Sequence, residues 1–206
     1  DYNRARLLAA RGQSLLSADD PRMAVLLNLR SSASWHKSEF AEAEQWAAQA
    51  LDVARRVDVQ ASVAESLSNL GLVALEQGNT DAARDFFHQS LDLFRAFDDR
   101  QGIADCLKNL GVTAAECSDY GTAQAFYQQS TALYRELNNL QGIADNLNNL
   151  GMAARIEGNY VVEKNCYQQS LALYLELGDK RGISGSLNSL GVAAILAFVV
   201  RDRVLM

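Results

Sequence analysis

The chain has 206 residues, of which 49% are hydrophobic, and its only proline is Pro21. This apolar content excludes an intrinsically disordered chain, and the scarcity of proline favours long helices. The formal net charge of −6 argues against nucleic-acid binding, which usually needs a basic face. The longest strongly apolar stretch, 190–200, is too short to span a bilayer, so we expect no membrane partner.

A forty-residue repeat organises the sequence. The phrase LSNLG at 67–71 returns as LKNLG at 107–111, LNNLG at 147–151 and LNSLG at 187–191. Residues 101–140 and 141–180 align without a gap and are identical at about half of their positions. Repetition at such a period is typical of arrays in which each unit buries its apolar face only against its neighbours.

The repeat divides the whole chain, 1–206, into a single array. The chain begins at Asp1 without a signal-like segment, so we expect a fragment of a longer protein. Residues 1–20 are expected to form a helix of a preceding partial unit, followed by full units at 21–60, 61–100, 101–140 and 141–180. The last unit, 181–206, is partial and has an atypical tail, because Phe198 falls where the other units have a turn.

Each unit contains two helical patterns separated by a turn. In the first, Ile103, Leu107, Leu110 and Ala114 lie on one face of an amphipathic helix. Turn signals follow at 78–79, 118–119 and 158–159, and the second pattern ends near 138–139 or 178–179. The sequence therefore predicts an all-α protein, an α-solenoid of about ten helices of about 15–18 residues each.

The repeated positions resemble those of the tetratricopeptide repeat in a forty-residue form. The similarity rests on the glycines at 71, 111, 151 and 191, the alanines at 74, 114 and 154 and at 83 and 123, the aromatics at 87, 127 and 167, and the serines at 90, 130 and 170. Glu163 departs from the pattern by replacing a small residue. The chain is similar to Pins/LGN-type scaffolds, kinesin light chains and the sensor arms of bacterial STAND and MalT-like regulators. The resemblance implies a right-handed superhelix of stacked antiparallel helix pairs, in which the first helix of each pair lines a concave groove.

A second stripe on the first helices is expected to face that groove. The resemblance implies a partner protein or peptide there, neutral to basic in charge, gripped along its main chain by a ladder of asparagines whose amides both donate and accept hydrogen bonds. Acidic positions would favour basic side chains of the partner, and apolar positions would receive apolar ones. The candidate ligand-binding residues are Asn69, Asn109, Asn149, Glu65, Asp105, Asp145, Leu72, Val112, Met152, Lys108, Asn148, Arg155 and Asn188.

Several alternatives remain beside this hypothesis. The asparagines could bond adjacent first helices to one another and shape the superhelix. The groove could belong to an effector-sensing arm that binds a small molecule or a short signalling peptide, which would need a pocket of a few hundred Å³. The apolar tail after residue 191 could make the chain a self-association module, a homodimer through an uncapped C-terminal helix.

Catalytic and metal-binding motifs are not recognised in the sequence. No phosphate-binding glycine loop, GxSxG or HExxH occurs, so we expect no enzyme, no cofactor and no metal. Asp98 and Asp99 are interpreted as turn and cap residues, while Glu65 and Asp105 could approach one another from neighbouring helices. Cys106, Cys117 and Cys166 are expected to be reduced, buried thiols. We expect the chain to be a segment of a larger cytoplasmic regulatory protein.

Overall fold

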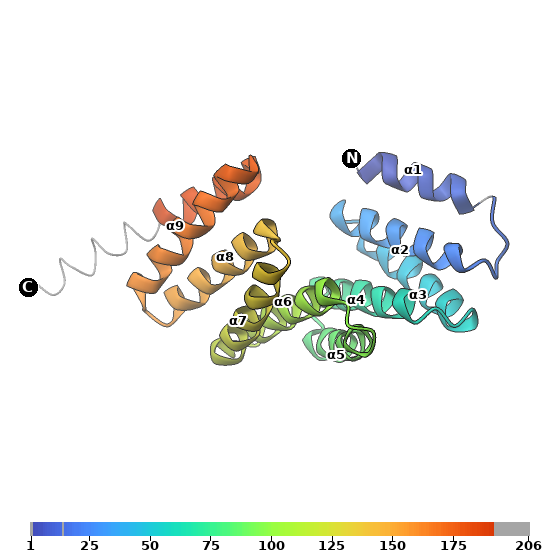
Figure 1. Ribbon diagram of the computed structural model, residues 1–206, viewed down its shortest axis with the longest axis horizontal. Coiled ribbons are helices and arrows are strands. Elements are labelled where there is room, and N and C mark those ends of the chain that lie inside the picture. The colour runs from blue at the N-terminus through green and yellow to red at the C-terminus, as the bar shows by residue number, and fades with distance from the viewer. Residues whose placement is uncertain (1, 14, 192–206) are drawn as a thin grey trace, which may run out of the picture. The chain divides into compact units, whose positions relative to one another are not determined.

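A computed structural model of the protein describes residues 2–13 and 15–191, and these are helical apart from short turns (Figure 1). The helices are α1 (Tyr2–Gln13), α2 (Pro21–His36), α3 (Phe40–Arg56), α4 (Gln60–Glu76), α5 (Thr80–Ala96), α6 (Arg100–Glu116), α7 (Tyr120–Glu136), α8 (Leu140–Ile156) and α9 (Tyr160–Leu177). A further helical segment covers 180–191. The predicted all-α class and number of helices are confirmed, and the predicted helix length holds for α2 to α9, whereas α1 is shorter, with 12 residues.

The helix ends recur at a spacing of twenty residues because each turn contains one residue in the left-handed conformation. These residues are Ser38, Asp58, Gly78, Asp98, Ser118, Asn138, Gly158 and Gly178. At Gly78, the following Asn79 donates its backbone N–H to Ala74 O over 2.9 Å, which ends α4. Asn79 Oδ1 then accepts from Ala82 N, which begins α5. The turns predicted from these residue pairs are confirmed.

The chain forms two compact units, residues 1–113 and 114–206, which we call unit 1 and unit 2. In unit 1, consecutive helices from α1 to α5 pack on one another, and the first helices α2 and α4 are also in contact. In unit 2, α8 packs against both α7 and α9. Each unit thus consists of successive helices packed side by side, as expected for a repeat array.

Close helix packing explains the repeated glycine and aromatic positions. A Cβ atom at Gly71 would lie 2.6 Å from Cε1 of Phe87, and one at Gly151 would lie 2.9 Å from the same atom of Tyr167. Such separations leave no room for a side chain, so the glycines allow the first and second helices to approach. Phe87 and Tyr167 are buried, as are Tyr127, Tyr134 and Tyr174, so these rings belong to the packing between helices.

The prediction that all three cysteines are buried is wrong for one of them. Cys106 and Cys166 are buried on helices, but Cys117 is exposed. Cys117 directly follows the last residue of α6, where the chain leaves the packed face and enters a turn. None of the helices within the described residues is long and apolar enough to cross a membrane. The predicted tail, 192–206, and the dimer proposed through it lie outside those residues.

Glu163 lies at a position where three other repeats have a buried alanine, Ala43, Ala83 and Ala123. Its side chain is fully buried at the start of α9, and neither carboxylate oxygen has a hydrogen-bond partner. Burial raises the pKa of this carboxyl group, and the nearby charge of Arg155 opposes the rise only in part. Glu163, which departs from the repeat pattern, is therefore a buried acidic side chain without a hydrogen bond in the folded protein.

Candidate binding groove on the first helices

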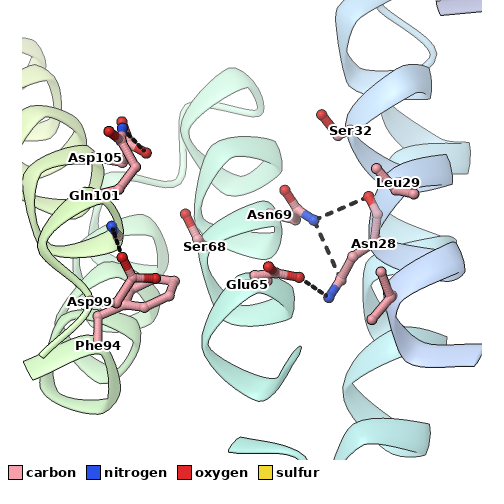
Figure 2. A pocket seen from close by; sticks show the side chains of 12 residues that line it. Asn28, Leu29, Ser32, Glu65, Ser68, Asn69, Phe94, Asp99, Gln101 and Asp105 are labelled. Carbon is pink, nitrogen blue, oxygen red and sulfur yellow. Dashed lines mark hydrogen bonds between the residues drawn. The ribbon is translucent and has the colours of Figure 1, made fainter. Parts of the chain in front are cut away.

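The candidate groove of unit 1 contains two adjoining cavities on α2, α4 and α6. The first, which we call the acidic pocket, has a volume of about 350 Å³. Its lining residues are Val25, Asn28, Leu29, Ser32, Glu65, Ser68, Asn69, Phe94, Asp99, Gln101, Gly102 and Asp105. Figure 2 shows α4 between the other two helices, with its Glu65, Ser68 and Asn69 side chains between those of α2 and α6. Glu65 and Asp105, expected to be able to approach one another, thus both line this cavity.

Asn28 of α2 fixes one wall of the acidic pocket. Its Nδ2 atom donates to Glu65 Oε2 over 3.3 Å and to Ser62 O over 3.2 Å. Its Oδ1 atom accepts from Ser66 Oγ over 2.8 Å. Because Asn28 is buried, these bonds are shielded from water and hold α2 and α4 in register. The amide thus positions the Glu65 carboxylate at the pocket (Figure 2).

The carboxylates of the acidic pocket influence one another. Burial is the main cause that raises the pKa of Glu65, the charge of Asp99 raises it further, and the bond from Asn28 opposes the shift. Asp99 Oδ1 accepts a hydrogen bond from Gly102 N over 3.0 Å at the start of α6, so the predicted capping role of Asp99 is confirmed. Asp105 accepts from Gln101 Nε2 over 3.0 Å. Acidic groups from different helices therefore converge on one cavity.

The second cavity, which we call the Trp35 pocket, has a volume of about 450 Å³. Its lining residues are Ser32, Trp35, His36, Ser68, Leu72, Leu75, Glu76, Asp105, Lys108, Asn109 and Val112. The rings of Trp35 and His36 meet edge to face with centroids 5.0 Å apart. Trp35, Leu72, Leu75 and Val112 make this cavity more apolar than its neighbour. Ser32, Ser68 and Asp105 line both cavities, which therefore adjoin one another.

The asparagine ladder is divided between the groove and the helix contacts. Asn69 lines the acidic pocket, but its Nδ2 atom donates to the backbone oxygen and to Oδ1 of Asn28, each over 3.4 Å. This bond joins α4 to α2, as the alternative interpretation of the ladder requires. Asn109 lines the Trp35 pocket although it is only 9% exposed. Asn69 therefore has a structural role as well as its place in the groove.

The predicted binding residues of unit 2 do not all line one cavity. Asn149 and Met152 line a cavity of about 260 Å³. Asp145 accepts hydrogen bonds from Gln141 Nε2 and, over 2.6 Å, from the hydroxyl of Tyr174. The Oδ1 atom of Asn148 is buried without a hydrogen-bond partner. Arg155 is half-buried on α8, and Asn188 is exposed on the 180–191 segment, so the structure does not bring these last two to the same cavity as Asn149.

Several groove residues were not predicted from the sequence. Asn28 and Trp35 belong to the 21–60 unit, whose first helix departs so far from the repeat that its stripe was not assigned. Asn28 and Trp35 lie forty residues before Ser68 and Leu75, so the repeat period could have located them. Asp99 was predicted only as a cap, because a cap explains an aspartate at a helix start without any site. No sequence signal distinguishes its second role, which depends on the packing of α4 beside α6.

Comparison with known proteins places this geometry in context. A family model for the tetratricopeptide repeat matches residues 22–96 and 62–136, which together cover more than half of the chain. No curated protein sequence matches the chain. Among solved structures, BtubC from P. vanneervenii has a TM-score of 0.74 at 18% identity, covering 95% of this chain and 81% of its own.

Two further solved structures have a similar fold. A Rap protein complexed with Competence and Sporulation Factor has a TM-score of 0.75 at 18% identity, and the alignment covers 85% of this chain and 53% of that protein. A STAND protein with a tetratricopeptide repeat sensor from Pyrococcus horikoshii has a TM-score of 0.75 at 11% identity, with coverage of 94% and 30%. This chain therefore spans about half of the Rap protein and less than a third of the STAND protein. Identities this low show the fold alone, whereas the family model covers the repeats directly: the chain belongs to the tetratricopeptide repeat family.

Proposed function

We propose that this protein is a non-catalytic binding module of a cytoplasmic regulatory protein, and that it binds a protein or peptide segment in the groove of unit 1. One observation supports this most directly. Every candidate residue predicted from the first-helix stripe in unit 1 lines one of the two adjoining cavities: Glu65, Asn69, Leu72, Asp105, Lys108, Asn109 and Val112. The predicted first-helix stripe of unit 1 therefore coincides with these two cavities, whereas a further cavity of the unit, beside α3, contains none of its residues.

The shape of the groove favours an extended partner over a small ligand. Because the acidic pocket lies nearer the N-terminal ends of α2, α4 and α6 and the Trp35 pocket lies nearer their C-terminal ends, a ligand that fills both must extend along these helices. A peptide segment has that length and presents side chains at regular intervals. The Rap protein of similar fold is complexed with Competence and Sporulation Factor, which supports a binding role for this chain.

The proposal can be tested by selecting random peptides displayed on phage against the immobilised protein. Selected peptides are then synthesised with a fluorophore, and their affinity is measured by anisotropy for the wild type and for Leu72→Ser. Loss of an apolar contact inside a groove is expected to weaken binding by about tenfold. The matched control is Leu175→Ser, because Leu175 is exposed on α9 of unit 2.

Circular dichroism melts of both variants establish that they fold like the wild type. Selected peptides that lose affinity for Leu72→Ser and keep it for Leu175→Ser support the groove as the binding site. Peptides that bind Leu72→Ser as tightly as the wild type would place the binding surface elsewhere and refute the proposal.

A further inference from the structure

The acidic pocket and the Trp35 pocket differ in chemistry although they adjoin. The acidic pocket is lined by the carboxylates of Glu65, Asp99 and Asp105, and none of the described residues that line it is a lysine, arginine or histidine. The Trp35 pocket combines an indole ring and three aliphatic side chains with polar residues, among them Glu76 and Lys108. A ligand that fills both must therefore present two unlike groups.

The acidic pocket suits a long cationic side chain better than a small ion. Val25 and Leu29 of α2 line it and are 43% and 50% exposed, so their aliphatic side chains are accessible to a ligand. An aliphatic stem can lie along such side chains while its charged end reaches carboxylates. Lysine and arginine both combine a methylene stem with a positive end. The amide of Gln101, which donates to Asp105, adds a polar rim.

The Trp35 pocket suits an apolar side chain. Leu72 and Val112 are half-buried and face a cavity of about 450 Å³, which is large enough for an aliphatic or aromatic side chain. The Nε1 atom of Trp35 is buried without a hydrogen-bond partner. Burial of the ligand's side chain against these residues would remove apolar surface from water.

We infer that the groove of unit 1 recognises a basic peptide segment, with a lysine or arginine side chain in the acidic pocket and an apolar side chain a few residues away in the Trp35 pocket. The inference rests on the proposed function and adds the chemistry of the partner. Charge complementarity identifies the basic residue, and the adjacency of the two cavities at Ser32, Ser68 and Asp105 allows one peptide chain to supply both side chains.

The state of Glu65 gives the interaction a pH dependence. The pKa of Glu65 is raised by burial and then by Asp99, and a bound cation would favour the ionised form instead. Affinity for a basic peptide is therefore expected to rise with pH through the titration of this carboxyl group. Affinity for a peptide without the cation lacks this dependence.

The experiment uses labelled synthetic peptides with a serine and alanine background, one lysine and one phenylalanine at separations of one to four residues. Partner peptides carry norleucine in place of lysine, which keeps the stem and removes the charge, or alanine in place of phenylalanine. Binding to the full chain is measured by anisotropy at low and moderate salt. For the best spacing, we expect each replacement to weaken binding by about tenfold, and the lysine effect to shrink with salt.

Two triple variants test where the lysine binds. Glu65→Gln/Asp99→Asn/Asp105→Asn removes the charges of the pocket, and asparagine at 99 can still cap α6. The matched control Asp81→Asn/Asp85→Asn/Asp92→Asn removes equal charge from exposed positions of α5. The pocket variant is expected to bind the lysine and norleucine peptides equally, and the control to distinguish them as the wild type does.

The outcomes separate this inference from the proposed function. If no peptide of the set binds, or if lysine and norleucine peptides bind the wild type equally, the basic-peptide inference is refuted, while peptides selected from the random library can still establish the groove. The basic-peptide inference is also refuted if the pocket variant and the control variant distinguish the lysine peptide from the norleucine peptide equally well. If lysine peptides bind but neither the pocket variant nor Leu72→Ser weakens them, the groove itself is refuted.

Discussion

A single residue, Glu163, illustrates how one substitution within a repeat changes local energetics. The carboxylate is fully buried and unbonded at a position that other repeats fill with alanine. A buried polar group that loses water without gaining a partner destabilises the folded state. The sequence identified the departure, but only packing showed that the side chain remains inside.

Replacement of Glu163 by alanine is expected to increase the free energy of unfolding by about 1–3 kcal/mol at neutral pH, because an unsatisfied buried group is removed. Urea denaturation followed by circular dichroism measures the change. The control is Glu157→Ala, which removes the same type of side chain from an exposed position and should change stability little. A loss of stability in Glu163→Ala would show that the carboxylate has a partner.

The same residue predicts a dependence of stability on pH. The pKa of Glu163 is higher in the folded than in the unfolded chain, so the folded state binds this proton more tightly. Its contribution to stability is therefore present below the unfolded pKa and is lost as pH rises through the folded pKa. The stability difference between Glu163→Ala and the wild type should accordingly grow as pH rises above the ordinary glutamate pKa, measured by the same urea denaturation. A difference that stays constant as pH rises would contradict the assignment.

The three cysteines are expected to differ in reactivity. Burial raises the pKa of Cys106 to about 11, and its thiol donates to Ser90 Oγ over 3.3 Å. Burial also raises the pKa of Cys166. Because the thiolate is the reactive form, a thiol reagent should modify exposed Cys117 first and the other two only on unfolding. Mass spectrometry of the native and the denatured protein measures this order, and rapid labelling of Cys106 in the native protein would refute it.

At the scale of elements, the helices follow closely from the sequence. Helix starts were predictable because Asn79, Asp119 and Asn159 each accept a backbone N–H from three residues later. Helix ends were predictable where glycine allows the left-handed turn, at 78 and 158. The turn at Asp58 is less evident, since aspartate adopts a positive φ less readily than glycine and the 21–60 unit diverges from the repeat.

Two helical glycines of unit 2 should respond in opposite ways to alanine. A Cβ at Gly142 would lie 2.6 Å from ring atoms of buried Tyr134, whereas a Cβ at Gly185 meets nothing within 4 Å. Gly142→Ala is expected to lower the free energy of unfolding by about 1–3 kcal/mol through overpacking. Gly185→Ala should raise it by up to about 1 kcal/mol through helix propensity. Thermal melts of the two variants distinguish them, and an equal response would contradict the packing described.

At the scale of the whole molecule, identical residues in the repeat frame have different surroundings. Leu147 is 7% exposed and Leu187, forty residues later, is 53% exposed. Leu147→Ala is therefore expected to lower the free energy of unfolding by about 2–4 kcal/mol, and Leu187→Ala by less than about 1 kcal/mol. Urea denaturation of both variants provides the measurement. Similar losses would show that the 180–191 segment is covered in solution.

The candidate site was predictable only in part, for a reason that belongs to this scale. The 3.6-residue period placed Glu65 and Leu72 on one stripe of their helix, and the forty-residue repeat placed Val112 at the equivalent position of the next first helix. Neither step required tertiary information. The contributions of Asn28 and Asp99 depend on how successive first helices approach one another, and single-helix periodicity contains no such information. The inward bond of Asn69 likewise depends on its neighbour α2.

The acidic pocket has a consequence for how such proteins diversify. Its walls come from α2, α4 and α6, which belong to three successive repeats, so no single repeat encodes it. Duplication or deletion of one forty-residue segment would bring different first helices together and create a new cavity without changing any codon within a repeat. Ligand choice in such an array can therefore change by recombination as well as by point mutation, because the order of the repeats determines which residues share a cavity.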